Sequence, residues 1–122
     1  MRYFVARGET ARLDASARRG RRGDFVVLSD GVTHYELAGP EPGGPTVVFV
    51  PGLTIPLDFW DGVVGELHDR GLRTLTYSAY GRGMSDRVRG RYGRELFVRQ
   101  LDDLVRHLEL APQHLVASSM GA

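Results

Sequence analysis

From residue 46 onward, the chain alternates between short apolar runs and longer segments whose apolar residues recur every three or four positions. The run Thr46–Val50 shows no polar alternation, which is typical of a strand covered on both faces in a parallel sheet. Further strands are predicted at Arg73–Tyr77 and Leu115–Ser118. The order strand, helix, strand, helix, strand predicts a doubly wound parallel sheet with right-handed crossovers.

The first segment between these strands has the spacing of an amphipathic helix. Asp58 is expected to cap its start, and Gly71 stands after its last turn, where left-handed backbone favours glycine. Its apolar residues follow the i, i+3, i+4, i+7 pattern: Trp60, Val63, Val64 and Leu67.

The second helical segment has a longer apolar face. Glu95 with Arg99, and Asp102 with Arg106, form i,i+4 pairs outside that face, and Pro112 is expected to end the helix. The predicted apolar face consists of Phe97, Val98, Leu101, Leu104, Val105 and Leu108.

Two β-rich runs precede these elements, at Phe25–Leu28 and Val32–Leu37. The linker Ser29–Gly31 contains Asp-Gly, the turn chemistry of an antiparallel hairpin. The segment 39–45 is rich in glycine and proline and is expected to be a loop. We expect five strands in the spatial order one, two, four, three, five, so that Thr46–Val50 lies between the last two strands of the chain.

Composition narrows the function classes. A chain of 122 residues that is 42% apolar can bury one core, and it has no cysteine for a disulfide or a thiolate metal site. We expect no metal and no cofactor. No apolar run is long enough for a secretory signal or a membrane span, so a cytoplasmic location without membrane attachment is expected. The formal net charge of +1 gives no strong attraction to nucleic acid.

The charge is unevenly distributed. Residues 1–23 contain seven arginines and two acids, a net charge of +5, whereas residues 24–122 carry −4. This head could be a contact arm for an acidic partner or a transit peptide. The interpretation we favour is that residues 1–23 form a poorly ordered, solvated terminus with a helical turn around residues 10–17. The remaining residues, 24–122, would then form the folded unit.

The end of the chain carries the candidate chemistry. Leu115–Ser118 leads into Ser119, which is flanked two residues away on both sides by the small residues Ala117 and Gly121. This pattern predicts a nucleophile elbow, a sharp strand-to-helix turn that tolerates almost no side chain at those two positions. Centring the pattern on the preceding serine would place a valine and a methionine there instead. Ser119 is therefore the candidate nucleophile.

The sequence resembles the N-terminal half of the α/β-hydrolase superfamily, in particular its lipase, esterase and epoxide-hydrolase-like members. Three blocks carry the resemblance, in the family's order and each at the end of a predicted strand: Val48–Leu53, Tyr80–Asp86 and the Ser119 elbow. The resemblance runs from about Phe25 to Ala122. It implies an α/β fold, a mostly parallel sheet with flanking helices and an N-terminal antiparallel hairpin, present here as a truncated α/β-hydrolase fold.

The resemblance also implies roles for individual residues. Ser119 would attack a carbonyl group, and the backbone amides of Leu53 and Met120 would form the oxyanion hole. The family's acid and histidine follow the nucleophile, but only three residues follow Ser119, so we expect both to be missing and the chain to be inactive alone. We expect structural roles for the four histidines, which are His34, His68, His107 and His114.

Several residues depart from the family pattern or lie outside its chemistry. Pro51 replaces the usual histidine before the oxyanion glycine, and Ser78 replaces an aspartate that anchors neighbouring amides. Ser85 and Asp86 are expected to shape their loop. A basic cluster could meet an anionic substrate or partner, although a solvated loop is the interpretation we favour: Arg87, Arg89, Arg91 and Arg94.

Two function classes remain open at this point. The first is an incomplete serine hydrolase that cleaves an ester, thioester, amide or similar bond, with a small-molecule substrate only in the complete enzyme. The alternative is a non-catalytic interaction module derived from a hydrolase. In either case the chain could self-associate or pair with a complementary C-terminal half, because the strand Leu115–Ser118 would present an apolar edge.

Overall fold

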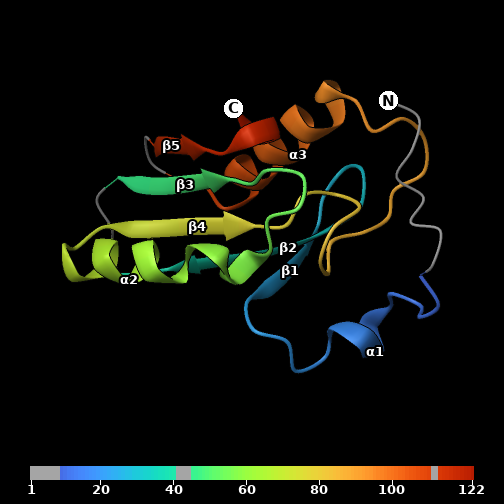
Figure 1. Cartoon of the computed structure of the whole chain (residues 1–122), viewed down its shortest axis with the longest axis horizontal. Helices are drawn as coiled ribbons and strands as arrows, with labels where there is room; N and C mark the ends of the chain where they lie inside the picture. Colours follow the sequence, from blue (N-terminus) through green and yellow to red (C-terminus); the bar gives the residue numbers. More distant parts are fainter. Residues whose placement is uncertain (1–8, 41–44, 111–112) are drawn as a thin grey trace.

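The computed structural model of the chain describes residues 9–40, 45–110 and 113–122. One five-stranded sheet organises these residues, with helices on both faces (Figure 1). The helices and strands have the following bounds: α1 Ala15–Arg18, β1 Asp24–Val27, β2 Val32–Ala38, β3 Thr46–Val50, α2 Asp61–Asp69, β4 Arg73–Tyr77, α3 Arg94–His107 and β5 Gln113–Ala117.

The predicted topology is confirmed: the strand order is β1-β2-β4-β3-β5. β1 and β2 form the expected antiparallel hairpin, and β2 also pairs antiparallel with β4. β3 pairs parallel with β4 on one side and β5 on the other, with Val48 opposite both Leu75 and Leu115. The sheet is therefore mixed, with its parallel part around β3.

The two faces of β3 carry different layers because successive side chains point to opposite faces of a strand. Val48 belongs to the main core cluster, which includes Leu75 of β4 and Leu104 of α3. Phe49 points the other way and meets Trp60, at the start of α2, with ring centroids 4.8 Å apart. Thus α2 and α3 cover opposite faces, as Figure 1 also shows.

The first predicted helix has the expected end but a different start. Gly71 has φ +80°, and its N–H donates to the His68 carbonyl (2.9 Å). This is the left-handed glycine end that the sequence predicted. The prediction that Asp58 caps the start is wrong, because Asp58 lies inside a 3₁₀ turn, Leu57–Trp60, that precedes α2. Val63, assigned to the apolar face, is 52% exposed.

The predicted apolar face of α3 is wrong in part. Leu104 is fully buried as expected, but Val98 is 59% exposed and the other buried positions are Leu96 and Gln100. The buried stripe therefore runs i, i+4, i+8 through a polar residue, which a search for apolar periodicity misses.

The two ion pairs predicted outside α3 have different outcomes. Asp102 and Arg106 form the expected i,i+4 pair. Arg99 pairs with Asp30 in the hairpin loop at 2.6 Å, so its predicted pairing with Glu95 is wrong. Pro112, predicted to end this helix, lies outside the described residues, and α3 ends at His107.

Gln100 satisfies polar groups inside the core. Its Oε1 accepts from the Tyr80 N–H (3.1 Å), and its Nε2 donates to the Thr33 hydroxyl (3.0 Å) and the Ser78 carbonyl (3.1 Å). These bonds tie α3 to β2 and to the loop after β4. A buried polar side chain of this kind is stabilising only while its partners are present.

We therefore expect Gln100→Leu to lower the free energy of unfolding by about 2–3 kcal/mol, because an apolar side chain of similar volume leaves the Tyr80 N–H buried without its partner. Urea unfolding measures this change. Arg106→Leu, at a side chain that is 77% exposed, is the matched control and should change stability by less than about 0.5 kcal/mol. Equal stability of both variants would contradict the role assigned to Gln100.

Ion pairs join the described part of the head, residues 9–23, to the rest of the chain. Arg22 forms hydrogen bonds with the carboxylates of Glu36 and Asp61, and those bonds hold the pKa of Asp61 below its usual range. Arg87 donates to Glu9 and lowers its pKa in the same way. Both carboxylates favour folding once ionised, so their small contributions are lost as pH falls through their lowered pKa values.

Candidate active site

The chain turns sharply where β5 ends. Ser118 is extended, whereas Ser119 has φ +52°, a left-handed conformation that is uncommon for a residue with a side chain. A 3₁₀ turn, Ser119–Gly121, follows at once, and the Gly121 N–H donates to the Ser118 carbonyl (2.9 Å). The backbone at Ser119 thus has the strained strand-to-helix form expected of a nucleophile elbow.

Gly121 lies against the end of β3. A Cβ at this position would be 2.6 Å from the Val50 carbonyl oxygen and 2.8 Å from that of Pro51. Both are backbone atoms, so the position requires glycine. Ala117, the other predicted elbow support, is exposed at the end of β5 and pairs with Val50. Its supporting role stays a prediction.

The loop after β3 contacts the elbow. A Cβ built on Gly52 would lie 3.1 Å from the Ser118 carbonyl oxygen and 3.2 Å from the Ser119 Cβ. Leu53, the next residue, lines a small cavity of about 30 Å³ together with Met120. The structure therefore brings together the two residues whose amides the sequence assigned to an oxyanion hole. The other lining residues are Tyr80, Gly81, Arg82, Tyr92 and Phe97.

Arg82 lies in the block Tyr80–Asp86, but the sequence alone predicted no role for it. Arg82 donates from Nε to the Leu53 carbonyl oxygen at 2.7 Å and so connects two of the three blocks that carry the family resemblance. The sequence pattern that could have indicated a role is an arginine between two glycines, Gly81 and Gly83, in the loop that follows the predicted strand Arg73–Tyr77.

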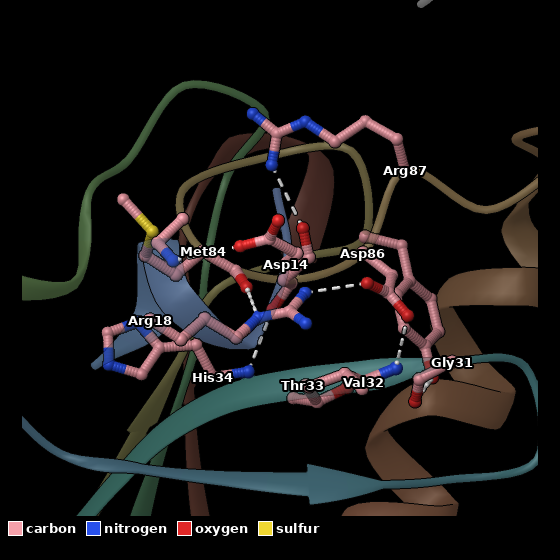
Figure 2. A network of polar contacts seen from close by, with 12 residues as sticks. Asp14, Arg18, Gly31, Val32, Thr33, His34, Met84, Asp86 and Arg87 are labelled. Atoms are coloured by element: carbon pink, nitrogen blue, oxygen red, sulfur yellow. Dashed lines mark hydrogen bonds and ion pairs between the residues drawn. The ribbon is translucent and has the colours of Figure 1, made fainter. Parts of the chain in front are cut away.

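Ser85 and Asp86 hold the loop after β4 in place, as expected. Figure 2 shows the Asp86 carboxylate between the Val32 backbone N–H (2.7 Å) and the Arg18 guanidinium (2.6 Å). Ser85 is fully buried and donates to the Ser78 carbonyl oxygen (2.7 Å). Ser78 thus anchors this loop through its backbone carbonyl group.

A larger open groove lies beside the elbow. It runs from Val50 and Tyr77 across α3 and is closed by Met120, Gly121 and Ala122. The basic cluster divides at this groove: Arg91 and Arg94 line it, Arg87 pairs with Glu9, and Arg89 is exposed.

The four histidines lie in other environments. His34 stacks on Phe25 and meets the Arg22 carbonyl through Nε2, and His68 Nε2 bonds Thr74 Oγ1 (2.9 Å). His107 ends α3, and His114 pairs with Val47 near the start of β5. None of the histidine hydrogen bonds found within the described ranges reaches Ser119.

Tyrosines near the site do not supply a base at neutral pH. Burial raises the pKa of Tyr77, Tyr80 and Tyr92 above the usual range of a phenol. Their hydroxyl groups therefore stay protonated and act as hydrogen-bond donors, as Tyr80 does toward the Gly31 carbonyl oxygen (3.1 Å).

Metal-binding clusters and membrane-spanning helices are both absent from the residues that the structure describes. Outside the ranges 1–8, 41–44 and 111–112, no group of three or more histidine, aspartate or glutamate side chains could hold a metal ion. Over the same part of the chain, no helix is both long and apolar enough to cross a membrane.

Known proteins were compared with this chain by sequence and by structure, and both comparisons found similar proteins. No family model matches the chain. It is 35% identical over 78 residues to the non-heme chloroperoxidase CPO-A1 of Kitasatospora aureofaciens, a match that covers 64% of this chain and 28% of that protein. Its structure is similar to a hydrolase from Pseudomonas aeruginosa PA01 (TM-score 0.75, 26% identity, 84% of this chain and 38% of that one). It is also similar to the enol-lactonase from Burkholderia xenovorans LB400 (TM-score 0.74, 26% identity, 80% and 38%).

The mixed sheet, the flanking helices and these relatives define the class, and the chain belongs to the α/β-hydrolase superfamily. Within that class it is similar to a chloroperoxidase and an enol-lactonase, each of which is much longer than the matched region. The chain spans 28% of the length of the curated relative and 38% of each of the two solved structures.

Proposed function

We propose that this chain contributes the nucleophile and the oxyanion site of a serine hydrolase. The observation that carries the proposal is the left-handed backbone of Ser119, with φ +52°, between β5 and a 3₁₀ turn. A non-glycine residue in such a conformation costs about 1–3 kcal/mol, and residues of this kind cluster at active sites. The shared cavity of Leu53 and Met120 supports the same proposal.

In the proposed reaction, Ser119 Oγ attacks a carbonyl carbon. The new C–O bond forms as the carbonyl π electrons move to oxygen, and the backbone N–H groups of Leu53 and Met120 stabilise that oxyanion. A base takes the hydroxyl proton. As the oxyanion collapses back to a carbonyl, the bond between the carbon and the leaving group breaks, and the base gives its proton to the leaving group. Water then hydrolyses the acyl-enzyme and frees the Ser119 hydroxyl. The substrate class is an ester, thioester, amide or similar bond, which includes the lactone named for one structural relative.

The base and the acid that orients it are proposed to come from polypeptide other than the described residues, since the contacts of the four histidines lie away from Ser119. The described chain is then inactive by itself and binds a small-molecule substrate only within a complete enzyme. The cytoplasmic location predicted from the sequence stays part of this proposal.

A non-catalytic interaction module is the second candidate. Two observations favour it: Pro51, which has no backbone N–H, precedes Gly52 in the loop that contacts the elbow, and β5 exposes apolar side chains along its length. In this second candidate function, the turn at Ser119 has no catalytic role, and the chain binds a partner through the edge of its sheet.

A fluorophosphonate probe, which reacts only with an activated serine, tests the main proposal. The isolated chain should stay unlabelled. A protein that combines this chain with a histidine and a carboxylate in place should be labelled at Ser119, and Ser119→Ala should abolish labelling while Ser118→Ala preserves it.

Three results of this experiment would contradict the proposal. Stoichiometric labelling of the isolated chain that disappears in Ser119→Ala would show that the described residues already supply a base. Labelling that persists in Ser119→Ala would show that another residue is the nucleophile. Absence of labelling in the complemented protein would favour the interaction module.

A further inference from the structure

The loop that carries Leu53 has few backbone restraints of its own. Pro51 has no N–H to donate. Within the loop, the Ile55 N–H reaches the Gly52 carbonyl oxygen at 3.4 Å, a long hydrogen bond. The loop nevertheless approaches the elbow closely, at Gly52 against Ser119. Its position near Ser119 therefore depends on contacts from other segments.

Arg82 provides such a contact. Its Nε donates to the Leu53 carbonyl oxygen at 2.7 Å, the short distance of a charge-assisted bond, and the side chain is half-buried. The bond crosses from the loop after β4 to the loop after β3, so it fixes the orientation of the Leu53 carbonyl group. Arg82 and Leu53 then line the same cavity as Met120.

The base of the Arg82 side chain is itself held firmly. The Arg82 N–H donates to the Ala79 carbonyl (3.0 Å), and its own carbonyl accepts from the Ser85 N–H (3.1 Å). The same turn is closed by the bond from the Gly81 N–H to the Asp86 carbonyl (2.9 Å). A guanidinium projecting from a fixed turn loses little freedom when it bonds the neighbouring loop.

We propose that Arg82 is a positioning residue for the oxyanion site. By binding the Leu53 carbonyl, Arg82 holds the Leu53 residue so that its N–H stays beside Met120 and Ser119. This inference rests on the proposed function, because it assigns the Leu53 N–H to the oxyanion. In this role Arg82 acts through the Leu53 carbonyl group rather than on the reacting atoms.

The first test does not depend on catalysis. Hydrogen exchange measured by NMR should show the half-buried Leu53 amide and the Ile55 amide, which bonds the Gly52 carbonyl, exchanging about tenfold faster in Arg82→Gln than in the parent chain, while β3 and α3 amides keep their rates. Arg82→Lys, which retains the charge and a donor, should restore part of the protection. Arg91→Gln, at an exposed arginine of the same loop, is the matched control and should leave both amides unchanged. Unchanged exchange in Arg82→Gln would overturn the inference.

The second test uses the complemented protein before any reaction with the probe. Arg82→Gln should lower kcat on an ester substrate by about tenfold to a hundredfold with KM changed by less than about twofold, because the oxyanion forms only in the transition state. Loosened Leu53 exchange with unchanged kcat would overturn the positioning role. If no form of the protein reacts with probe or ester, the proposed function fails, and the exchange data still decide whether Arg82 orders the loop.

Discussion

Replacing Gly121 with alanine should destabilise the chain by about 3 kcal/mol, because the new methyl group would lie 2.6 Å from the Val50 carbonyl oxygen and 2.8 Å from the Pro51 carbonyl oxygen. Neither atom belongs to a flexible side chain, so relief requires moving the end of β3 or the elbow. Urea unfolding measures the loss of stability, and the Ser119 amide chemical shift reports the change at the elbow.

Gly65→Ala is the control for this substitution. Gly65 lies in α2 with nothing within 4 Å of the position that a Cβ would take. Alanine should therefore raise stability there by about 0.5–1 kcal/mol, since glycine is a poor helix former. If Gly121→Ala is as stable as Gly65→Ala and leaves the Ser119 amide unshifted, the close packing of the elbow against β3 is wrong.

The sequence was sufficient to predict the sheet because the decisive signals are local. The unbroken run at Thr46–Val50 predicted a central parallel strand, and Asp-Gly in the linker Ser29–Gly31 predicted the hairpin. The small residues around Ser119 predicted a sharp turn, and the left-handed φ of Ser119 agrees with it. Each of these features follows from steric constraints within a few residues of chain.

The errors concern contacts between distant segments. Gln100 interrupts an apolar pattern, so its burial could not be inferred until Tyr80, Thr33 and Ser78 were seen around it. Arg99 had an acid at helical spacing, yet it pairs with Asp30, which is 69 positions away. Charge and spacing along one helix do not reveal which partners the fold brings near.

Part of the candidate site was predicted from the sequence, and part of it could be identified only in the structure. Ser119 and Gly121 were predicted from motif spacing, and Leu53 from the family resemblance. The contact of Arg82 required the structure, because its partner is 29 positions away. The N-terminal head is another example. Its arginine excess suggested solvation, but Arg18 reaches Asp86 with a side chain that is only 12% exposed. An excess of one charge in a sequence gives no information about where the opposite charges will lie.

The outer edge of β5 is the surface that should dominate the behaviour of the isolated chain. β5 is the last strand of the sheet among the described residues, pairing with β3 on one side. Leu115 is 60% exposed and Val116 is 41% exposed, so both faces of the strand present apolar side chains at this edge of the sheet. Such an edge is a template for another strand.

The opposite edge of the sheet is less suited to pairing. β1 has four residues, it begins at Asp24, and the charged Arg22 side chain lies close to it in sequence. Short strands and charged residues protect an edge against pairing with another chain. Val27 is nevertheless 77% exposed on β1, which makes it a matched position for comparison with Leu115.

We expect the isolated chain to self-associate through β5, and Leu115→Lys to weaken this association at least about tenfold, because a lysine on an edge strand disfavours pairing with another strand. Val27→Lys should leave the association unchanged. Light scattering and sedimentation over a range of concentrations measure both variants against the parent chain.

A parent chain that stays monomeric and unfolds in one sharp thermal transition would show that five strands form a self-standing domain with a tolerated edge. Equal effects of the two lysines would place the contact away from β5. Addition of a complementary C-terminal half should compete with self-association, because both would occupy the same backbone groups along β5.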